Sequence, residues 1–327
     1  MFDKVLSFID KHQSFILTTH DPPDADGLGA QLVFAAIIKN RGKNVRIINS
    51  SAIPTYNRFM DQDYIAEIWN AEKHSGLLEN SAIIVMDTSD EYHLGPMRQT
   101  LKKAKDVFIF DHHEPRPKQK YTGFIEPTAS STAELSIELA DFVGITLDQD
   151  TATAAYAGIV YDSGFFAYPK TTIRSFKAAS KTLEWGANPN HIYRQLMENG
   201  SCAAIMLQKQ ALSNLEFFAG KKIAAMVLRK EDFEISGACQ EDTEGIVNIP
   251  MKAREVEVSL LIKEKMTGEV RCSLRSKGSV NVSKIAQGFG GGGHISAAGF
   301  KSSLGPEDTL KKLLYFIEEH KYISMEK

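Results

Sequence analysis

The sequence predicts an α/β protein with two domains: a doubly wound parallel sheet in the amino-terminal half and a smaller α/β domain with a mixed sheet in the carboxy-terminal half, joined by a helical linker. In the first half, short apolar runs alternate with helical segments, which is typical of parallel strands buried on both faces. In the second half, polar and apolar residues alternate along the strands, which is typical of a sheet with one wet face. The length of 327 residues also suits two domains at roughly 150 residues each.

The elements of the first domain, residues 1–186, are expected in a simple order. Residues 1–13 form an amphipathic helix. Apolar strands are predicted at 15–20, 45–50, 81–87 and 106–111, and helices at 27–40 and 130–144. Ser131 and Glu134 fit a capping box at the start of the last helix, and Gly144 lies at its end. We therefore interpret the serines before this helix as caps rather than as catalytic groups.

Residues 187–218 are predicted to be a helical linker, and residues 219–327 the second domain. Within it, strands are expected at 222–233 and 256–264, and a turn at 266–268 leads into a further strand at 269–277. Residues 281–287 read as a short helix before a glycine run, and 306–320 form the last helix. The pattern predicts a hairpin with one face in water.

Composition excludes several classes of protein. A chain with 43% hydrophobic and 24% charged residues is neither disordered nor fibrous. A net charge of -3 argues against coating of long duplex nucleic acid. No run of about 18 apolar residues predicts a membrane span. The three cysteines, Cys202, Cys239 and Cys272, are far apart, which favours a reducing, cytoplasmic location.

Acidic and histidine residues gather just after the apolar runs of the first domain. They are His20, Asp24 and Asp26 after the first run, Asp87 after the third, Asp111, His112 and His113 after the fourth, and Asp162 after the apolar segment 154–161, which we also interpret as a strand. Open α/β sheets bind ligands outside the carboxyl ends of their strands. Four segments are therefore expected to deliver these side chains to one edge.

This combination of residue types predicts a metal site. Crowded carboxylates repel one another unless cations compensate. Mixed imidazole and carboxylate ligands suit Mn²⁺ better than Ca²⁺, and no thiolate accompanies them. A carboxylate shared by two ions is an arrangement used for phosphoryl hydrolysis. A single Asp after a strand is usually a cap or a turn residue, so the prediction depends on the four segments together.

The same residues resemble the four motifs of the DHH phosphoesterases: HDPPDADGLGA at 20–30, VMDTS at 85–89, FDHH at 110–113 and YDSG at 161–164. GGGGHISAAG at 290–299 resembles the signature of the DHH-associated domain. Length and pattern are most similar to the NrnA-type nano-RNases and adenosine 3′,5′-bisphosphate phosphatases. The resemblance implies that the first domain is the catalytic, metal-binding domain and that the second binds substrate.

The resemblance also implies roles for individual residues. Two Mn²⁺ ions, with Mg²⁺ or Co²⁺ as substitutes, would be held by His20, Asp24 and Asp87 and by Asp26, Asp87, His112 and Asp162. Asp87 would bridge the ions, Asp111 would orient its neighbours, and His113 would face the substrate phosphate. Arg275 and the loop of Gly291, Gly292, Gly293 and His294 would bind the substrate, and we expect Phe165, Phe166 and Tyr168 to stack on a base or to pack in the core.

The expected activity is hydrolysis of short RNA or DNA oligonucleotides, about two to five residues long, to 5′-mononucleotides, and of adenosine 3′,5′-bisphosphate to AMP. Residues 251–301 contain nine Lys or Arg and four Glu, which suits a short anionic substrate. There are two alternatives. The first is a phosphodiesterase for cyclic di-AMP or linear dinucleotides, and the second is a nucleotide sensor that binds its ligand without turnover. The sequence leaves the physiological substrate, the polarity of cleavage and a homodimer open.

Overall fold

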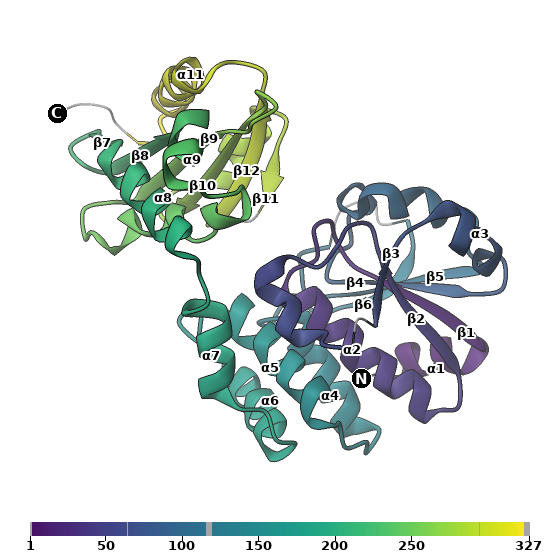
Figure 1. Ribbon diagram of the computed structural model, residues 1–327. Helices are drawn as coiled ribbons and strands as arrows, with labels where there is room; N and C mark the ends of the chain where they lie inside the picture. The colour runs from purple at the N-terminus through teal and green to yellow at the C-terminus, as the bar shows by residue number, and fades with distance from the viewer. Residues whose placement is uncertain (1, 64, 116–119, 294, 324–327) are drawn as a thin grey trace. The chain divides into compact units, whose positions relative to one another are not determined.

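The computed structural model describes residues 2–63, 65–115, 120–293 and 295–323. It divides into two compact units, Met1–Asn199 and Gly200–Lys327, each built on a six-stranded sheet (Figure 1). The predicted linker is shared between them. Helix α7 (Pro189–Met197) belongs to the first unit, where it packs on α5, and α8 (Cys202–Ser213) belongs to the second, where it packs on β8.

The sheet of the first unit is parallel throughout, as predicted. Its strands lie in the order β3-β2-β1-β4-β5-β6. Their bounds are β1 (Ser14–Thr18), β2 (Asn44–Asn49), β3 (Ala66–Ile68), β4 (Ala82–Met86), β5 (Asp106–Asp111) and β6 (Thr122–Ile125). The order reverses between β1 and β4, so the switch point of the fold lies there, which is where ligands bind in open α/β sheets.

Both faces of this sheet are buried, because successive strand residues point to opposite faces. Leu17 and Ile84 join the core on one face, whereas Ile16 and Ile83 join the core on the other. The first face is covered by α1 (Asp3–Lys11), α2 (Ala25–Asn40), α4 (Thr132–Phe142), α5 (Gln149–Asp162) and α6 (Ile173–Glu184), and the second by α3 (Ala71–Leu78) and the 3-10 segment η2 (Glu91–Thr100). The doubly wound prediction is therefore confirmed.

The start of α4 differs in detail from the predicted capping box. Ser131 is the N-cap, and its hydroxyl accepts from the backbone N–H of Glu134 at 2.9 Å. The carboxylate of Glu134, however, accepts from the hydroxyl of Ser130 at 2.6 Å instead of returning to the cap. Glu134 is fully buried and also lies 3.3 Å from Arg174, so the carboxylate has these partners in place of the cap backbone.

The second unit carries a mixed sheet in the order β11-β12-β10-β9-β8-β7, in which only β8 and β9 pair in parallel. Its strands are β7 (Leu215–Phe218), β8 (Ile223–Leu228), β9 (Val258–Glu264), β10 (Val270–Ser276), β11 (Gly292–Gly293) and β12 (Ala297–Ser302). Helices α10 (Val282–Gln287) and α11 (Pro306–Glu319) cover one face, and α8 and α9 (Lys230–Ser236) cover part of the other.

The prediction of one wet face holds for β10, in which buried and half-buried residues alternate. It is wrong for β9, which is buried from Val258 to Ile262, and for β8, which is buried along its whole length. The strand predicted at 222–233 ends at Leu228 of β8, because Lys230–Ser236 form α9. Met226 and Leu228 of β8 pack with Leu207 of α8 and Phe233 of α9. Helices α8 and α9 therefore cover the face of the sheet that the alternating sequence pattern predicted to be exposed to water. Among the helices in the described part of the chain, none is long and apolar enough to cross a bilayer.

Candidate metal centre

Three strand ends at the carboxyl edge of the first sheet bring most of the predicted ligands together. His20 follows β1, Asp87 follows β4, and Asp111 ends β5 immediately before His112. The loop after β1 leads into α2, whose N-cap is Asp24; its carboxylate accepts from the backbone N–H of Gly27 at 2.9 Å. The local folding of each segment thus places a side chain at the same edge.

Asp162 reaches this cluster from a helix and not from a strand, so that part of the sequence analysis is wrong. It is the last residue of α5, which begins after the N-cap Asp148. The segment is rich in alanine and carries a cap at its start, which favours a helix. The end of α5 nevertheless places the Asp162 carboxylate 3.0 Å from the Nε2 atom of His112.

The side chains form three overlapping groups in which the potential ligand atoms lie within 4.8 Å of one another. The groups are His20, Asp24 and Asp87; Asp87, His112 and His113; and Asp26, His112 and Asp162. Asp87 connects the first two. Its Oδ2 atom lies 3.4 Å from His20 Nε2, and its Oδ1 atom lies 3.5 Å from His112 Nε2. One carboxylate therefore faces two neighbouring sets of ligands.

The carboxylates of the cluster repel one another strongly, and this repulsion shifts their pKa values. Burial, together with the charges of Asp87 and Asp162, raises the pKa of Asp26 well above its usual value. Burial and the charge of Asp24 likewise raise the pKa of Asp87. Burial opposes protonation of His112, but Asp162 and Asp87 outweigh it and raise the pKa of His112 to about 9. The buried carboxylates thus disfavour one another's ionised forms, and the neighbouring imidazole favours its charged form.

A divalent cation fits this donor set. The Oδ2 atom of Asp111 is buried and makes no hydrogen bond with the described residues. A buried polar atom without a partner is costly unless a ligand or an ion satisfies it. Imidazole and carboxylate groups are ligands of Mn²⁺ and related ions. The structure therefore places acidic and histidine side chains for metal binding.

The start of α4 supports these side chains, and the sequence analysis missed this role. The backbone N–H groups of Thr132 and Ala133 each donate to the carboxylate of Asp26 at 2.7 Å. The Thr132 hydroxyl donates to Asp87 Oδ1 at 2.9 Å, and His112 Nδ1 lies 3.3 Å from the carbonyl oxygen of Ala129. Such contacts fix the orientation of metal ligands. The capping pattern predicted where α4 begins and gave no signal for these bonds.

His113 and Asp111 form a pair beside the cluster. The Nδ1 atom of His113 lies 2.7 Å from Asp111 Oδ1, and its backbone N–H donates to the same oxygen at 3.1 Å. Burial acts against both charges, yet the contact lowers the pKa of Asp111 and raises that of His113. His113 Nδ1 also lies 3.7 Å from Asp87 Oδ1, so the half-buried imidazole stands at the open side of the cluster.

The loop after Asp162 has an unusual backbone. Gly164, Phe165 and Phe166 all have positive φ angles, of 56°, 54° and 66°, which is rare for phenylalanine. Phe166 packs on Phe176 in a stacked arrangement, whereas Phe165 and Tyr168 are exposed. The loop ends near Lys170, whose ammonium group donates to the carbonyl oxygen of His112 at 3.3 Å. Lys170 is a further residue at the site, and the sequence analysis assigned it no role of its own.

Of the predicted substrate residues of the second unit, Arg275 lies on β10, Gly291 directly precedes β11, and Gly292 and Gly293 form β11. Arg275 is half-buried on the row of β10 that faces away from α10 and α11, and its guanidinium donates to the carbonyl oxygen of Leu274 at 3.1 Å. Gly291 has no room for a side chain because the backbone of Gly299 and Phe300 lies against it, and a Cβ at Gly293 would lie 2.5 Å from the carbonyl oxygen of Ala297. Contact with β12 therefore already requires glycine there. His294 lies outside the described residues.

Fold and cluster together define a class: α/β proteins that place acidic and histidine side chains for metal binding at the carboxyl edge of a parallel sheet. The comparison with protein families agrees with it. Residues 14–159 match the DHH family, N-terminal domain, and residues 220–320 match the DHHA1 domain. The chain therefore contains a DHH N-terminal domain followed by a DHHA1 domain.

Individual relatives are similar over most of the chain. A protein of Streptococcus mutans, named probable bifunctional oligoribonuclease and PAP phosphatase NrnA, is 27% identical over 92% of this chain and 93% of its own. The cyclic-di-AMP phosphodiesterase PdeA of Listeria monocytogenes is 29% identical over 85% of this chain but only 43% of its own. The crystal structure of an exopolyphosphatase-related protein from Bacteroides fragilis superposes with a TM-score of 0.89 at 24% identity, over 98% of this chain and 96% of that one.

Proposed function

We propose that the protein is a two-metal phosphoesterase that hydrolyses short oligonucleotides to 5′-mononucleotides and adenosine 3′,5′-bisphosphate to AMP. The observation that carries the proposal is the buried carboxylate of Asp87, which faces His20 on one side and His112 on the other. The relative from Streptococcus mutans, whose name includes both activities, supports the choice of substrate because the match spans nearly the whole of both chains.

The residues that would hold the two ions are those of the cluster. His20, Asp24 and Asp87 would bind one ion, and Asp26, Asp87, His112 and Asp162 the other. Mn²⁺ suits the mixture of imidazole and carboxylate, with Mg²⁺ or Co²⁺ as substitutes. A pair of divalent ions held by these residues would supply a water molecule of lowered pKa and electrostatic stabilisation of a phosphate.

The side chains of this protein then have separate tasks. Thr132 and the backbone at the start of α4 hold Asp87 and Asp26 in place. Asp111 fixes the ring of His113 and favours its protonated form. A protonated imidazole at the open side of the cluster would bind a phosphate oxygen and stabilise the charge that develops there. Arg275 and the loop 291–294 would bind a second phosphate or the sugar.

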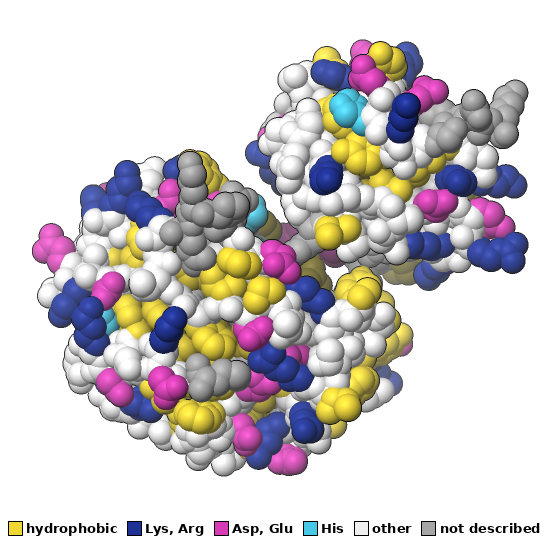
Figure 2. All heavy atoms as spheres, turned by 180° about the vertical axis from the view of Figure 1, so that it is seen from behind, with side chains coloured by type: hydrophobic (Ala, Val, Ile, Leu, Met, Phe, Trp, Pro, Cys, Tyr) yellow, Lys and Arg dark blue, Asp and Glu magenta, His cyan; other side chains and the backbone are white. Residues whose placement is uncertain are grey.

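Short single-stranded substrates fit the charge of the protein better than long duplexes. The face of the first unit in Figure 2 mixes basic and acidic side chains, whereas proteins that bind long duplexes carry a basic patch or stripe. We therefore propose short RNA or DNA oligonucleotides and nucleotide bisphosphates as partners, acting in the cytoplasm.

A cyclic di-AMP phosphodiesterase is the second candidate. The relative from Listeria monocytogenes favours it, and the same cluster would serve either phosphodiester. A nucleotide sensor is a weaker alternative, since sensing alone does not need two sets of metal ligands that share a carboxylate.

Side-by-side hydrolysis of a dinucleotide, adenosine 3′,5′-bisphosphate, cyclic di-AMP and a 24-mer with Mn²⁺ tests the proposal. We expect turnover of the first two and a sharp decrease beyond about five nucleotides, although longer strands offer more phosphate contacts. Preference for cyclic di-AMP would replace the main proposal by the second candidate. Equal or faster hydrolysis of the 24-mer would indicate a processive exonuclease, and binding without turnover a sensor.

A further inference from the structure

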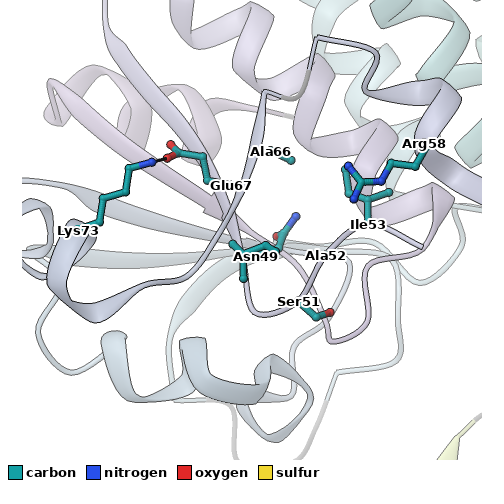
Figure 3. Close-up of a pocket in the computed structure, with 9 residues that line it drawn as sticks. Asn49, Ser51, Ala52, Ile53, Arg58, Ala66, Glu67 and Lys73 are labelled. Carbon is teal, nitrogen blue, oxygen red and sulfur yellow. Dashed lines mark hydrogen bonds and ion pairs between the residues drawn. The ribbon is translucent and has the colours of Figure 1, made fainter. Parts of the chain in front are cut away.

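A cavity of about 330 Å³ lies at the carboxyl ends of β2 and β3, beside the strand that leads to His20. Figure 3 shows residues that line it, with Lys73 and Glu67 on one side, Arg58 and Ile53 on the other, and Asn49 between them. None of these residues belongs to the candidate metal centre. The motifs found in the sequence do not include them either.

Asn49 connects the cavity to the first metal-binding loop. It is 1% exposed, and its side-chain oxygen accepts from the backbone N–H of Thr19 at 3.2 Å and from the amide of Gln31 at 2.8 Å. Its own amide donates to the Gln31 side-chain oxygen at 3.1 Å. Thr19 immediately precedes His20. An amide has two N–H donors, and among the described residues only Gln31 accepts from this one. The second donor is thus available to a ligand in the cavity, in an orientation fixed by the three bonds.

The walls of the cavity combine apolar surface with one unsatisfied hydroxyl. Ile53, Ala66 and Ile68 supply the apolar surface. The Ser51 hydroxyl oxygen is buried and makes no hydrogen bond with the described residues. A buried hydroxyl without a partner is costly, and this one lies where a ligand in the cavity would supply the partner.

The charges at the cavity favour a ligand that is not itself a cation. Glu67 is the acidic residue among those lining it, and Arg46 binds its carboxylate through two bonds of 2.7 and 2.6 Å, with Lys73 at 2.5 Å. Although burial acts in the opposite direction, these partners lower the pKa of Glu67 to about 2. Arg58 adds a guanidinium group, which stacks readily on aromatic rings.

We propose that this cavity, called here the base slot, holds a nucleobase of the substrate whose phosphate lies at the metal centre. A nucleobase has apolar faces for Ile53 and Ile68, a π-face for Arg58 and an edge of donors and acceptors for Asn49 and Ser51. Neighbouring strands lie about 4.8 Å apart. The slot over β2 and β3 is thus two or three strand spacings, roughly 10–14 Å, from the cluster over β1, β4 and β5. An extended nucleoside attached to the scissile phosphate can span this distance.

The inference rests on the proposed function, and Ala52 offers a way to test it. Ala52 lines the slot and is exposed, so Ala52→Trp fills the slot without removing a core contact. Ala71→Trp is the matched control, because Ala71 is an exposed alanine nearby that does not line the slot. The substrates are the dinucleotide pApA and the same phosphodiester without bases, both with Mn²⁺.

We expect Ala52→Trp to lower kcat/KM for pApA by roughly five- to a hundredfold, the range for loss of one stacked base. Hydrolysis of the base-free substrate should stay at the wild-type rate, and Ala71→Trp should match the wild type on both. Equal losses on the two substrates, or no loss on pApA, would overturn the base slot.

Binding of AMP to the metal-free protein, followed by titration calorimetry, separates this inference from the proposed function. Wild-type protein should bind AMP, and Ala52→Trp should bind it at least fivefold more weakly. Ser51→Ala, which removes the unpaired hydroxyl, should also weaken it. If the wild type binds AMP and Ala52→Trp does not, but neither substrate is hydrolysed, the slot is supported while the proposed function fails. Equal AMP affinity in wild type and Ala52→Trp would contradict the slot itself.

Discussion

Asp87 combines an unusual backbone with an unfavourable charge. It has a positive φ of 59°, a conformation that Asn and Asp adopt more readily than most residues. Burial and the charge of Asp24 both disfavour its ionised form. A residue that costs stability in two ways, yet faces two sets of ligands, is best explained by its role at the cluster.

The first prediction replaces this carboxylate by an amide. Asp87→Asn should abolish hydrolysis of a dinucleotide and weaken Mn²⁺ binding, because one oxygen is proposed to contact each ion. In EDTA-treated protein the variant should be at least as stable as the wild type, since a buried negative charge is removed while the backbone conformation stays accessible. Thermal unfolding and Mn²⁺ titration measure the two effects. Wild-type binding of two Mn²⁺ ions by the variant would contradict the assignment.

The second prediction concerns Thr132, whose hydroxyl donates to Asp87 at 2.9 Å. Thr132→Val keeps the shape but removes the donor, and should weaken Mn²⁺ binding about 10- to 100-fold, as for other groups that orient metal ligands. Thr132→Ser keeps the hydroxyl and should recover most of the affinity. If Val and Ser variants bind Mn²⁺ equally well, the hydroxyl does not orient Asp87.

At the scale of elements, α2 and α5 approach closely because glycine lies between them. A Cβ atom on Gly29 of α2 would lie 2.6 Å from the carbonyl oxygen of Ala154 in α5. These two helices supply Asp26 and Asp162 to the cluster. Their close contact therefore sets how far apart those two carboxylates lie.

The third prediction tests this contact. Gly29→Ala should lower the free energy of unfolding by about 1–3 kcal/mol, as expected for overpacking, although alanine is the better helix former. Gly76→Ala in α3 is the control, because nothing lies within 4 Å of the added atom, and it should be neutral or stabilising. Chemical denaturation measures both. A stabilising Gly29→Ala would mean that the helices can move apart at little cost.

The fourth prediction concerns the ion pairs that connect β2, β3 and α3 through Glu67. Its partners outweigh burial and lower its pKa from 4.5 to about 2, so its contribution to stability is complete above pH 4.5 and disappears as the pH falls toward 2. The difference in unfolding free energy between wild type and Glu67→Gln should shrink over this range. A constant difference between pH 6 and pH 2.5 would contradict the lowered pKa.

At the scale of the whole molecule, the proposal separates chemistry in the first unit from substrate binding in the second. The fifth prediction is that Arg275→Ala leaves Mn²⁺ binding unchanged but lowers dinucleotide hydrolysis about tenfold to more than a hundredfold, the value of a charge-assisted hydrogen bond. Arg254→Ala, at an arginine whose side chain is 94% exposed, is the control. Loss of bound Mn²⁺ in Arg275→Ala would contradict this division of roles.

The sequence by itself determined the parallel sheet and the edge at which the candidate site lies. Apolar β-branched runs predict buried strands from local pattern alone, and the carboxyl ends of parallel strands meet at one edge whatever else the chain does. The positions of His20, Asp87 and His112 after such runs therefore sufficed to predict that they lie together. Their order and spacing also sufficed for the resemblance to the DHH family, which the family comparison confirms.

Tertiary structure alone decided how the site is completed. Asp162 arrives on a helix, and Thr132 contacts Asp26 across 106 positions of sequence, because both depend on how α4 and α5 pack on α2. The burial of β8 depends in the same way on α8 and α9, which cover the second face of its sheet. The base slot is lined by residues of β2, β3, η1 (Thr55–Met60) and α3. The periodicity of apolar residues along a segment indicates only which side of that one helix or strand is buried. The features named here depend on contacts between segments far apart in the sequence, and a local pattern does not encode those contacts.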